Sequence, residues 1–136
     1  MSMKLTSTKY SDTVFSIATL VLRLGLGSLM IPHGYDKLQH FTERSQTFTN
    51  PFHLGSTVSL VLVIFAEFFC SCLLVLGLFT RLACIPLIIT TCVIVFYSNH
   101  GALFGKGELG AVYLIGYLAL LFLGPGNVSM DRLIGK

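Results

Sequence analysis

The sequence predicts an all-α protein that crosses a membrane as a four-helix bundle. The chain has 136 residues, of which 54% are hydrophobic and only 11% are charged. Soluble domains usually carry about 25% charged residues, so this chain has too few charges to cover a surface that faces water. Four apolar stretches approach the length of about 20 residues that a helix needs to cross a bilayer. We therefore expect one multi-pass domain over residues 1–136.

The four expected spans cover residues 14–33, 57–79, 82–98 and 109–124. The first could be mistaken for a signal peptide, but its apolar run is too long, it contains Arg23, and no small-residue cleavage site follows. We interpret it as an uncleaved membrane helix. The last two spans are short, so we expect them to stand nearly upright or to thin the bilayer.

Four spans place both termini on the same side of the membrane. Five basic residues belong to that side and three to the other: Lys4, Lys9, Arg81, Arg132 and Lys136 against Lys37, Arg44 and Lys106. Because cytoplasmic loops are enriched in lysine and arginine, this difference favours cytoplasmic termini.

The connection between the first two spans, residues 34–55, is long for a compact domain, and such connections are often functional. Tyr35, Leu38, Phe41 and Phe48 recur in it at roughly helical spacing. This pattern predicts a short helix that lies in the membrane interface and ends at Asn50-Pro51.

Two ionisable residues, Arg23 and Glu67, lie deep inside predicted spans. Each costs about 2.5–3.5 kcal/mol at the centre of a bilayer. Counted from the span ends, both fall near mid-depth on antiparallel helices, so we expect them to face and neutralise each other. The residues that share a helix face with each charge include small and polar ones, as an interior seam requires. The shared faces are Gly27, Met30, Gly34 and Lys37 with Arg23, and Ser56, Leu60, Val63, Ser71 and Leu74 with Glu67.

Two interpretations of this pair remain open. It can lock two helices in register, which is one role of buried ion pairs. Alternatively it lines a polar cavity that holds a ligand or relays a proton, because ionisable groups inside membranes often mark such paths.

A second polar group is expected at the non-cytoplasmic end, where it could form a mouth leading to the buried pair. Glu108 would also suit the N-terminus of the fourth helix, and His33 would also suit a membrane interface. The members of this group are His33, Gly34, Lys37, His100, Lys106 and Glu108. On the other side, Arg81 is expected to anchor the topology, and Asp131 with Arg132 to form a solvated cap or to contact Arg81.

The sequence argues against several kinds of chemistry. The four cysteines form no C-x-x-C pair and fit no zinc pattern, so we expect buried free thiols and no metal site. The histidines lie at span ends or in loops, which argues against haem, and the scattered basic residues argue against nucleic acid. No nucleotide-binding or hydrolase motif occurs. We therefore assign no catalytic residue and expect no built-in cofactor.

A series of short motifs, in this order along residues 15–135, resembles the DoxX family of small four-helix membrane proteins. The motifs are Arg23, HGYDKL at 33–38, FAE at 65–67, LGLFTRLA at 76–83, GKGE at 105–108 and GPGNVSMDRL at 124–133. The resemblance implies a protein of the prokaryotic inner membrane, associated with quinone-linked respiratory or sulfur-oxidising complexes or, through partner enzymes, with thiol and oxidative-stress chemistry. The positions that match the family's polar pattern are Arg23, His33, Lys37, Glu67, Arg81 and Glu108.

Three functions remain in view from the sequence. The first is a membrane subunit of a quinone-linked redox system, in which a partner enzyme brings the redox centre and Arg23, His33 or Tyr113 donates hydrogen bonds to the quinone. Residues 34–55 and the C-terminal tail would then be the docking surfaces. The second is a small transporter or proton path gated by Arg23 and Glu67, and the third is a scaffold without chemistry. The sequence also leaves a homodimer open.

Overall fold

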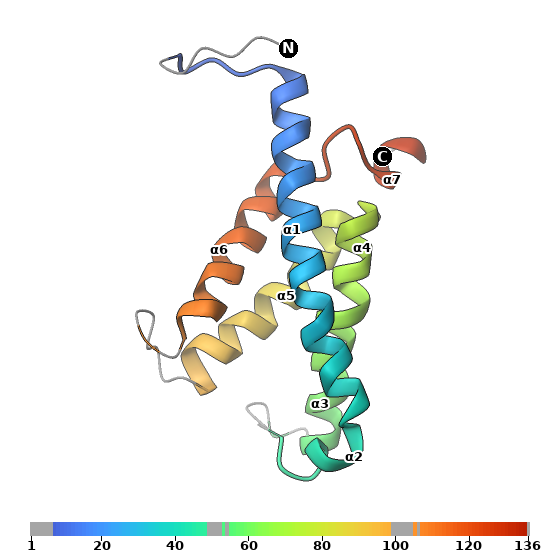
Figure 1. The fold of residues 1–136 in the computed structure, drawn as a ribbon, viewed down its shortest axis with the longest axis vertical. Helices are drawn as coiled ribbons and strands as arrows, with labels where there is room; N and C mark the ends of the chain where they lie inside the picture. Colours follow the sequence, from blue (N-terminus) through green and yellow to red (C-terminus); the bar gives the residue numbers. More distant parts are fainter. Residues whose placement is uncertain (1–6, 49–52, 54, 99–104, 106, 136) are drawn as a thin grey trace.

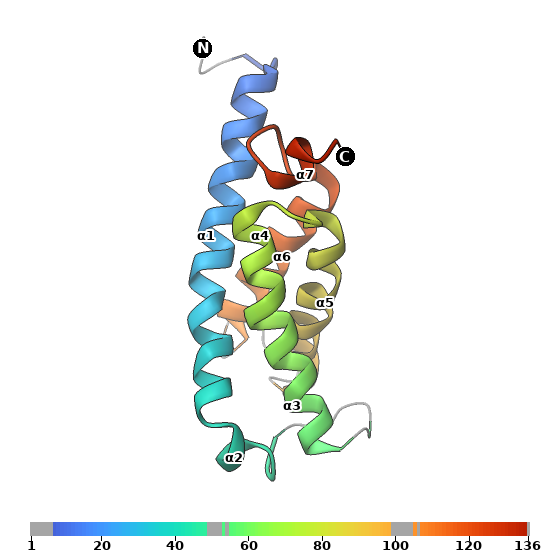
Figure 2. The ribbon, with the colours of Figure 1, turned by 90° about the vertical axis from the view of Figure 1, so that its right-hand side faces the viewer.

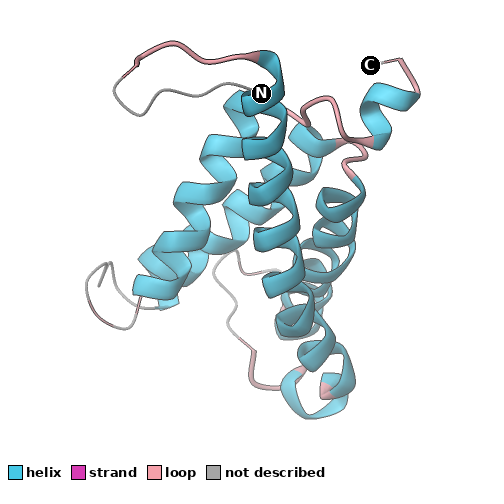
Figure 3. Ribbon diagram, turned by 45° about the horizontal axis from the view of Figure 1, so that its top comes forward, coloured by secondary structure: helices cyan, strands magenta, loops and turns pink. Residues whose placement is uncertain are grey.

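The computed structural model describes residues 7–48, 53, 55–98, 105 and 107–135, and within these ranges it contains helices and loops but no strand (Figure 3). Three consecutive segments, α3, η1 and α4, form one continuous helix, and α5 with η2 forms another. The elements are α1 (Asp12–Gln39), α2 (Phe41–Arg44), α3 (Ser56–Ile64), η1 (Phe65–Cys70), α4 (Ser71–Leu76), α5 (Thr80–Cys92), η2 (Val93–Ser98), α6 (Glu108–Leu123) and α7 (Met130–Leu133).

Three helices of the described chain are long and apolar enough to cross a membrane: Asp12–Gln39, Ser56–Leu76 and Thr80–Tyr97. The predicted fourth span corresponds to α6, which is apolar but has 16 residues. At 1.5 Å per residue it is about 24 Å long, shorter than the hydrocarbon core of roughly 30 Å. The all-α, membrane-spanning prediction is confirmed, with three helices of full spanning length and one shorter apolar helix.

The largest difference from the predicted boundaries is at the end of the first helix. The expected span ended at residue 33, where the sequence turns polar, but α1 continues to Gln39. Tyr35 and Leu38 therefore belong to α1, and the separate helix of the connection is reduced to the four residues of α2. A helix continues past the apolar run when its polar side chains find partners, as Lys37 does here. The expected end at Asn50-Pro51 lies outside the described residues.

The long helices pack side by side. α1 runs antiparallel to the α3–η1–α4 helix and packs against it, and α5 packs against α6 (Figures 1 and 2). The start of α1 and the short helix α7 lie at one end of the bundle, and α2 lies at the other. In the view of Figure 1, α5 and α3 diverge toward the end where α2 lies.

Close backbone contact sets the register between α1 and η1. A Cβ atom on Gly34 would lie 2.6 Å from the backbone nitrogen of Phe68 and 2.9 Å from the carbonyl carbon of Glu67. Small residues allow membrane helices to approach this closely. Gly34 therefore fixes which residues of the second helix lie beside the end of α1.

Candidate functional site

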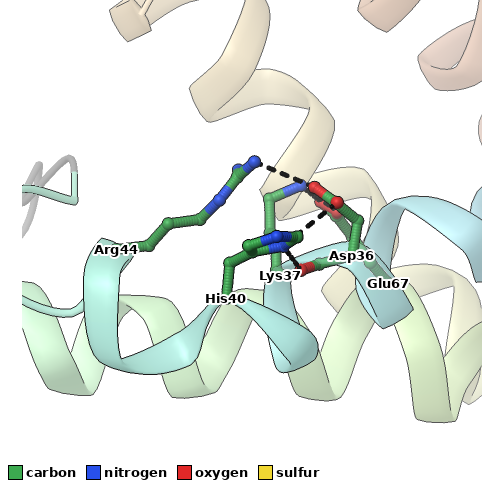
Figure 4. Close-up of polar contacts among 5 residues, drawn as sticks. All are labelled: Asp36, Lys37, His40, Arg44 and Glu67. Carbon is green, nitrogen blue, oxygen red and sulfur yellow. Dashed lines mark hydrogen bonds and ion pairs between the residues drawn. The ribbon is translucent and has the colours of Figure 1, made fainter.

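An ion pair between Lys37 and Glu67 joins the end of α1 to η1. The Lys37 Nζ atom lies 2.7 Å from both carboxylate oxygens of Glu67. The Glu67 side chain is 1% exposed and that of Lys37 is 17% exposed. Figure 4 shows the pair beside a second polar cluster at the end of α1. The buried carboxylate is thus held by a cation that reaches it from the edge of the bundle.

The second cluster is exposed and connects α2 to α1. The Arg44 guanidinium donates to the Asp36 carboxylate at 2.8 Å, and His40 Nδ1 lies 3.3 Å from the other Asp36 oxygen. These contacts place the start of the connection next to the Lys37–Glu67 pair (Figure 4).

The expectation that Arg23 neutralises Glu67 is wrong. Gly34 is the residue of α1 that lies against Glu67. Arg23 precedes Gly34 by eleven residues, so it lies about 16 Å along the helix axis from the level of Glu67. The predicted depth was counted from the ends of the apolar runs. Because α1 extends to Gln39, the helices pair in a different register, and Lys37 takes the place expected for Arg23.

Arg23 instead lies at the opposite end of the bundle, enclosed by the C-terminal segment. Its guanidinium donates to the Val128 carbonyl, and only 1% of the residue is exposed. It packs directly on Gly77, where a Cβ atom would lie 1.9 Å from Nη1 and where the φ of 73° favours glycine. Asp131 is the acidic group that acts on Arg23 electrostatically.

Asp131 itself is buried and holds the start of α5. Its two carboxylate oxygens accept hydrogen bonds from the backbone nitrogens of Phe79, at 2.8 Å, and Thr80, at 3.0 Å. The expected solvated cap with Arg132 is therefore wrong for Asp131, which is 5% exposed. A carboxylate at a helix N-terminus is favourable because it satisfies free N–H groups and complements the helix dipole.

We expect the Asp131→Ala variant to lose about 2 kcal/mol of stability, because one buried and one partly buried N–H group lose their charged acceptor. The free energy of unfolding in mild detergent measures this loss. Glu43→Ala, which removes an exposed carboxylate from α2, is the control and should change the free energy little. Equal free energies of unfolding for Asp131→Ala and Glu43→Ala would contradict a structural role for Asp131.

A cavity of about 410 Å³ lies beside the Lys37–Glu67 pair, between the α3–η1 helix and the α5–η2 helix. This volume is within the range of small-molecule sites, about 300–1,000 Å³. Its polar lining residues are Lys37, Ser59, Glu67 and Thr90, and its apolar lining residues are Phe48, Leu62, Val63, Phe65, Ala66, Pro86, Ile89, Val93 and Ile94. The site is thus an apolar cavity with an ion pair in its wall.

Irregular helical backbone surrounds this cavity. Glu67 lies in η1 and Val93 in η2, two segments that are π-helical rather than α-helical. Pro86 lies inside α5, where it cannot donate the usual backbone hydrogen bond. π-Helical turns are frequently found at functional sites, since they widen the helix and redirect side chains.

The other predicted site residues lie apart from the cavity. His33 is exposed and contacts the buried Tyr113 edge-to-face, with ring centroids 6.1 Å apart. Glu108 is exposed in the first turn of α6. Arg81 is exposed and donates to the Phe122 carbonyl at 3.3 Å. The structure therefore places Lys37 and Glu67 of the predicted set in the cavity wall and Tyr113 close enough to Glu67 for an electrostatic effect. His100 and Lys106 lie outside the described residues.

Several lining residues were not found from the sequence. Ser59 precedes Glu67 by eight residues and so shares its helix face, which was an available signal. Thr90 and Phe48 come from a different span and from the connection, and no local pattern links them to Glu67. Within the described part of the chain, no three histidine, cysteine or acidic side chains gather as a metal site would require, and the four cysteines are unpaired.

The fold and the site define a multi-pass helical membrane protein with a ligand-sized cavity beside an internal ion pair. A family model, DoxX, matches residues 18–100, which is more than half of the chain. The chain therefore belongs to the DoxX family, whose members are membrane proteins often linked to redox or thiol oxidative-stress systems. No curated protein and no solved structure matches it.

Proposed function

We propose that the protein is a membrane subunit of a quinone-linked redox system, and that the cavity beside Lys37 and Glu67 binds the quinone. The observation that carries this proposal is the combination of an apolar cavity of about 410 Å³ with one buried ion pair in its wall. A quinone has two parts that match this combination. The carbonyl oxygens of its ring can accept hydrogen bonds from the ion pair, and its apolar tail suits the apolar wall.

The lysine is suited to hold a carbonyl oxygen. Lysine carries three N–H donors, of which two point to the oxygens of Glu67. No other described residue accepts a hydrogen bond from Lys37, so the third donor is available to an acceptor in the cavity. The Glu67 carboxylate keeps the ammonium group in place, and it can also accept a proton from a quinol.

The cavity opens toward the surroundings of the bundle. Leu62, Phe65 and Ile89 line it and are about half exposed, at 50%, 48% and 50%. In a bilayer these side chains face lipid, so an apolar ligand could enter sideways from the membrane without crossing water.

The proposal includes a particular membrane arrangement and a partner. α1, α3–α4, α5–η2 and α6 would be four spans in the inner membrane of a prokaryote, with both termini in the cytoplasm. The Lys37–Glu67 end would then lie near the outer surface. A partner enzyme would supply the redox centre and dock on the α1–α3 connection, which reaches the cavity through Phe48.

The test is to purify the protein in mild detergent and to extract it for mass spectrometry of ubiquinone and menaquinone. We expect about one quinone per chain in the wild type. Glu67→Gln should retain less quinone by a factor of about ten or more, because an amide holds the Lys37 ammonium less firmly than a carboxylate does. A tenfold loss of affinity corresponds to about 1.4 kcal/mol.

The matched control is Glu108→Gln, which makes the same change to an exposed carboxylate outside the cavity lining. It should retain quinone as the wild type does. A wild type without quinone, even after incubation with a short-chain quinone, would contradict the proposal, and so would equal retention in Glu67→Gln and Glu108→Gln.

A further inference from the structure

The interior between α4 and α6 is built in matching layers. The two helices run in the same direction (Figures 1 and 2), and the Tyr117 hydroxyl lies near that of Ser71, without the geometry of a direct hydrogen bond. Buried residues follow at spacings of four and three on both helices, which are Glu67, Ser71 and Leu74 on one and Tyr113, Tyr117 and Leu120 on the other. Glu67 acts electrostatically on Tyr113, and Ser71 lies near Tyr117, so these residues form two layers. Because the spacing to the next buried residue is three on both helices, we infer that Leu74 and Leu120 form the third layer.

The middle layer is polar, and its hydroxyl groups lack hydrogen-bond partners within the part of the chain that the structure describes. The hydroxyl groups of Ser71 and Tyr117 have no hydrogen-bond partner among the residues that the structure describes, although both residues are 0% exposed. The same holds, for the described chain, of Arg23 Nε and Nη1 and of the Thr80 hydroxyl near the other end of the bundle. On the second helix Leu74 lies between Ser71 and Gly77, the residue on which Arg23 packs, so the inferred layer of Leu74 and Leu120, both 0% exposed, falls between these two polar regions.

Buried polar groups without a protein partner usually bind ordered water. We propose that water occupies the polar regions on both sides of Leu74 and Leu120, and that these regions are two arms of a proton path that this leucine layer closes. One arm leads from Lys37 and Glu67 to Ser71 and Tyr117. The other arm lies at Arg23 and Thr80.

Proton movement along such an arm needs no other reactant. Each hydroxyl group or water accepts a proton on one side and releases another on the other side, so that every group ends in its original state. The leucine layer has neither donor nor acceptor side chains, and a dry apolar constriction stops ions and protons. The inference goes beyond the proposed function, because it does not require a quinone in the cavity.

The test uses the full chain in phospholipid vesicles that contain a pH-sensitive dye. A potassium diffusion potential drives protons inward. We expect wild-type vesicles to match protein-free vesicles, and Leu74→Ser to admit protons several-fold faster, because a hydroxyl joins the two arms. Adding Tyr117→Phe to Leu74→Ser should return the rate toward that of the wild type. The control is Leu76→Ser, which makes the same change at a 51% exposed position on the outside of the helix.

Leu120→Ser changes the same layer from α6 and should give the same increase. Wild-type rates in Leu74→Ser and Leu120→Ser proteins that elute and reconstitute normally would overturn the proposal. Fast proton entry through the wild type would also overturn it.

A further measurement leaves the leucine layer unchanged. If water binds the Tyr117 hydroxyl, Tyr117→Phe should lower the thermal midpoint in detergent, because a hydrogen-bonded group is lost. A higher midpoint would mean that the hydroxyl has no partner, and it would overturn the water sites even if the leucine variants failed to fold.

Discussion

Lys37→Met is expected to destabilise the protein by about 3–5 kcal/mol, the cost of breaking a buried ion pair by removing one partner. The reason is the position of Glu67. Its side chain is 1% exposed, and both of its carboxylate oxygens accept a hydrogen bond from Lys37 Nζ at 2.7 Å. Without the ammonium group, the carboxylate remains in an apolar interior with no counter-charge. The free energy of unfolding, measured by denaturing-detergent titration from mild detergent micelles, gives this loss directly.

The double variant Lys37→Met with Glu67→Gln should recover most of the loss, because no uncompensated charge remains. Arg44→Met is the matched control. Arg44 forms an ion pair with Asp36 at a similar distance, 2.8 Å, but the two side chains are 43% and 49% exposed. Such a surface pair contributes about 0–1 kcal/mol. A loss in Lys37→Met no larger than that in Arg44→Met would show that the buried pair does not stabilise the bundle.

Gly34→Ala is expected to cost about 3 kcal/mol, at the upper end of the range for overpacking. The added methyl group would lie 2.6 Å from the Phe68 nitrogen and 2.9 Å from the Glu67 carbonyl carbon. Backbone atoms cannot rotate away as a side chain can, so α1 and η1 must move apart. This movement also pulls Lys37 from Glu67, and we therefore expect weaker quinone retention together with a lower free energy of unfolding.

Gly25→Ala provides the comparison on the same helix. A Cβ atom on Gly25 would meet nothing within 4 Å. Alanine favours the helix over glycine by up to about 1 kcal/mol, so this variant should be as stable as the wild type or slightly more stable. Equal destabilisation of Gly25→Ala and Gly34→Ala would contradict the close approach of α1 and η1.

The helices, their inward faces and two residues of the candidate site, Lys37 and Glu67, could be predicted from the sequence. Spans follow from the length of an apolar run, and faces follow from the 3.6-residue period, both of which are local properties. The buried residues of α1 include Arg23, Gly27, Met30 and Gly34, as the shared face predicted. Glu67 was identified because a carboxylate within an apolar run is conspicuous on its own.

The partners of the two buried charges could not be predicted in the same way. The choice of Lys37 for Glu67 depends on the register of two helices, which is set by the backbone contact at Gly34 and by the continuation of α1 past residue 33. Arg23 donates a hydrogen bond to a carbonyl 105 residues away, at Val128. No local pattern carries information about contacts over that separation.

The sequence by itself therefore determined an all-helical membrane protein with a buried carboxylate in its second apolar segment, because burial and periodicity act within each helix. Only the tertiary structure decided that Lys37 holds this carboxylate, that the C-terminal segment encloses Arg23, and that a cavity opens between α3–η1 and α5–η2. These features depend on how helices approach and diverge, and that depends on backbone contacts between residues far apart in the chain.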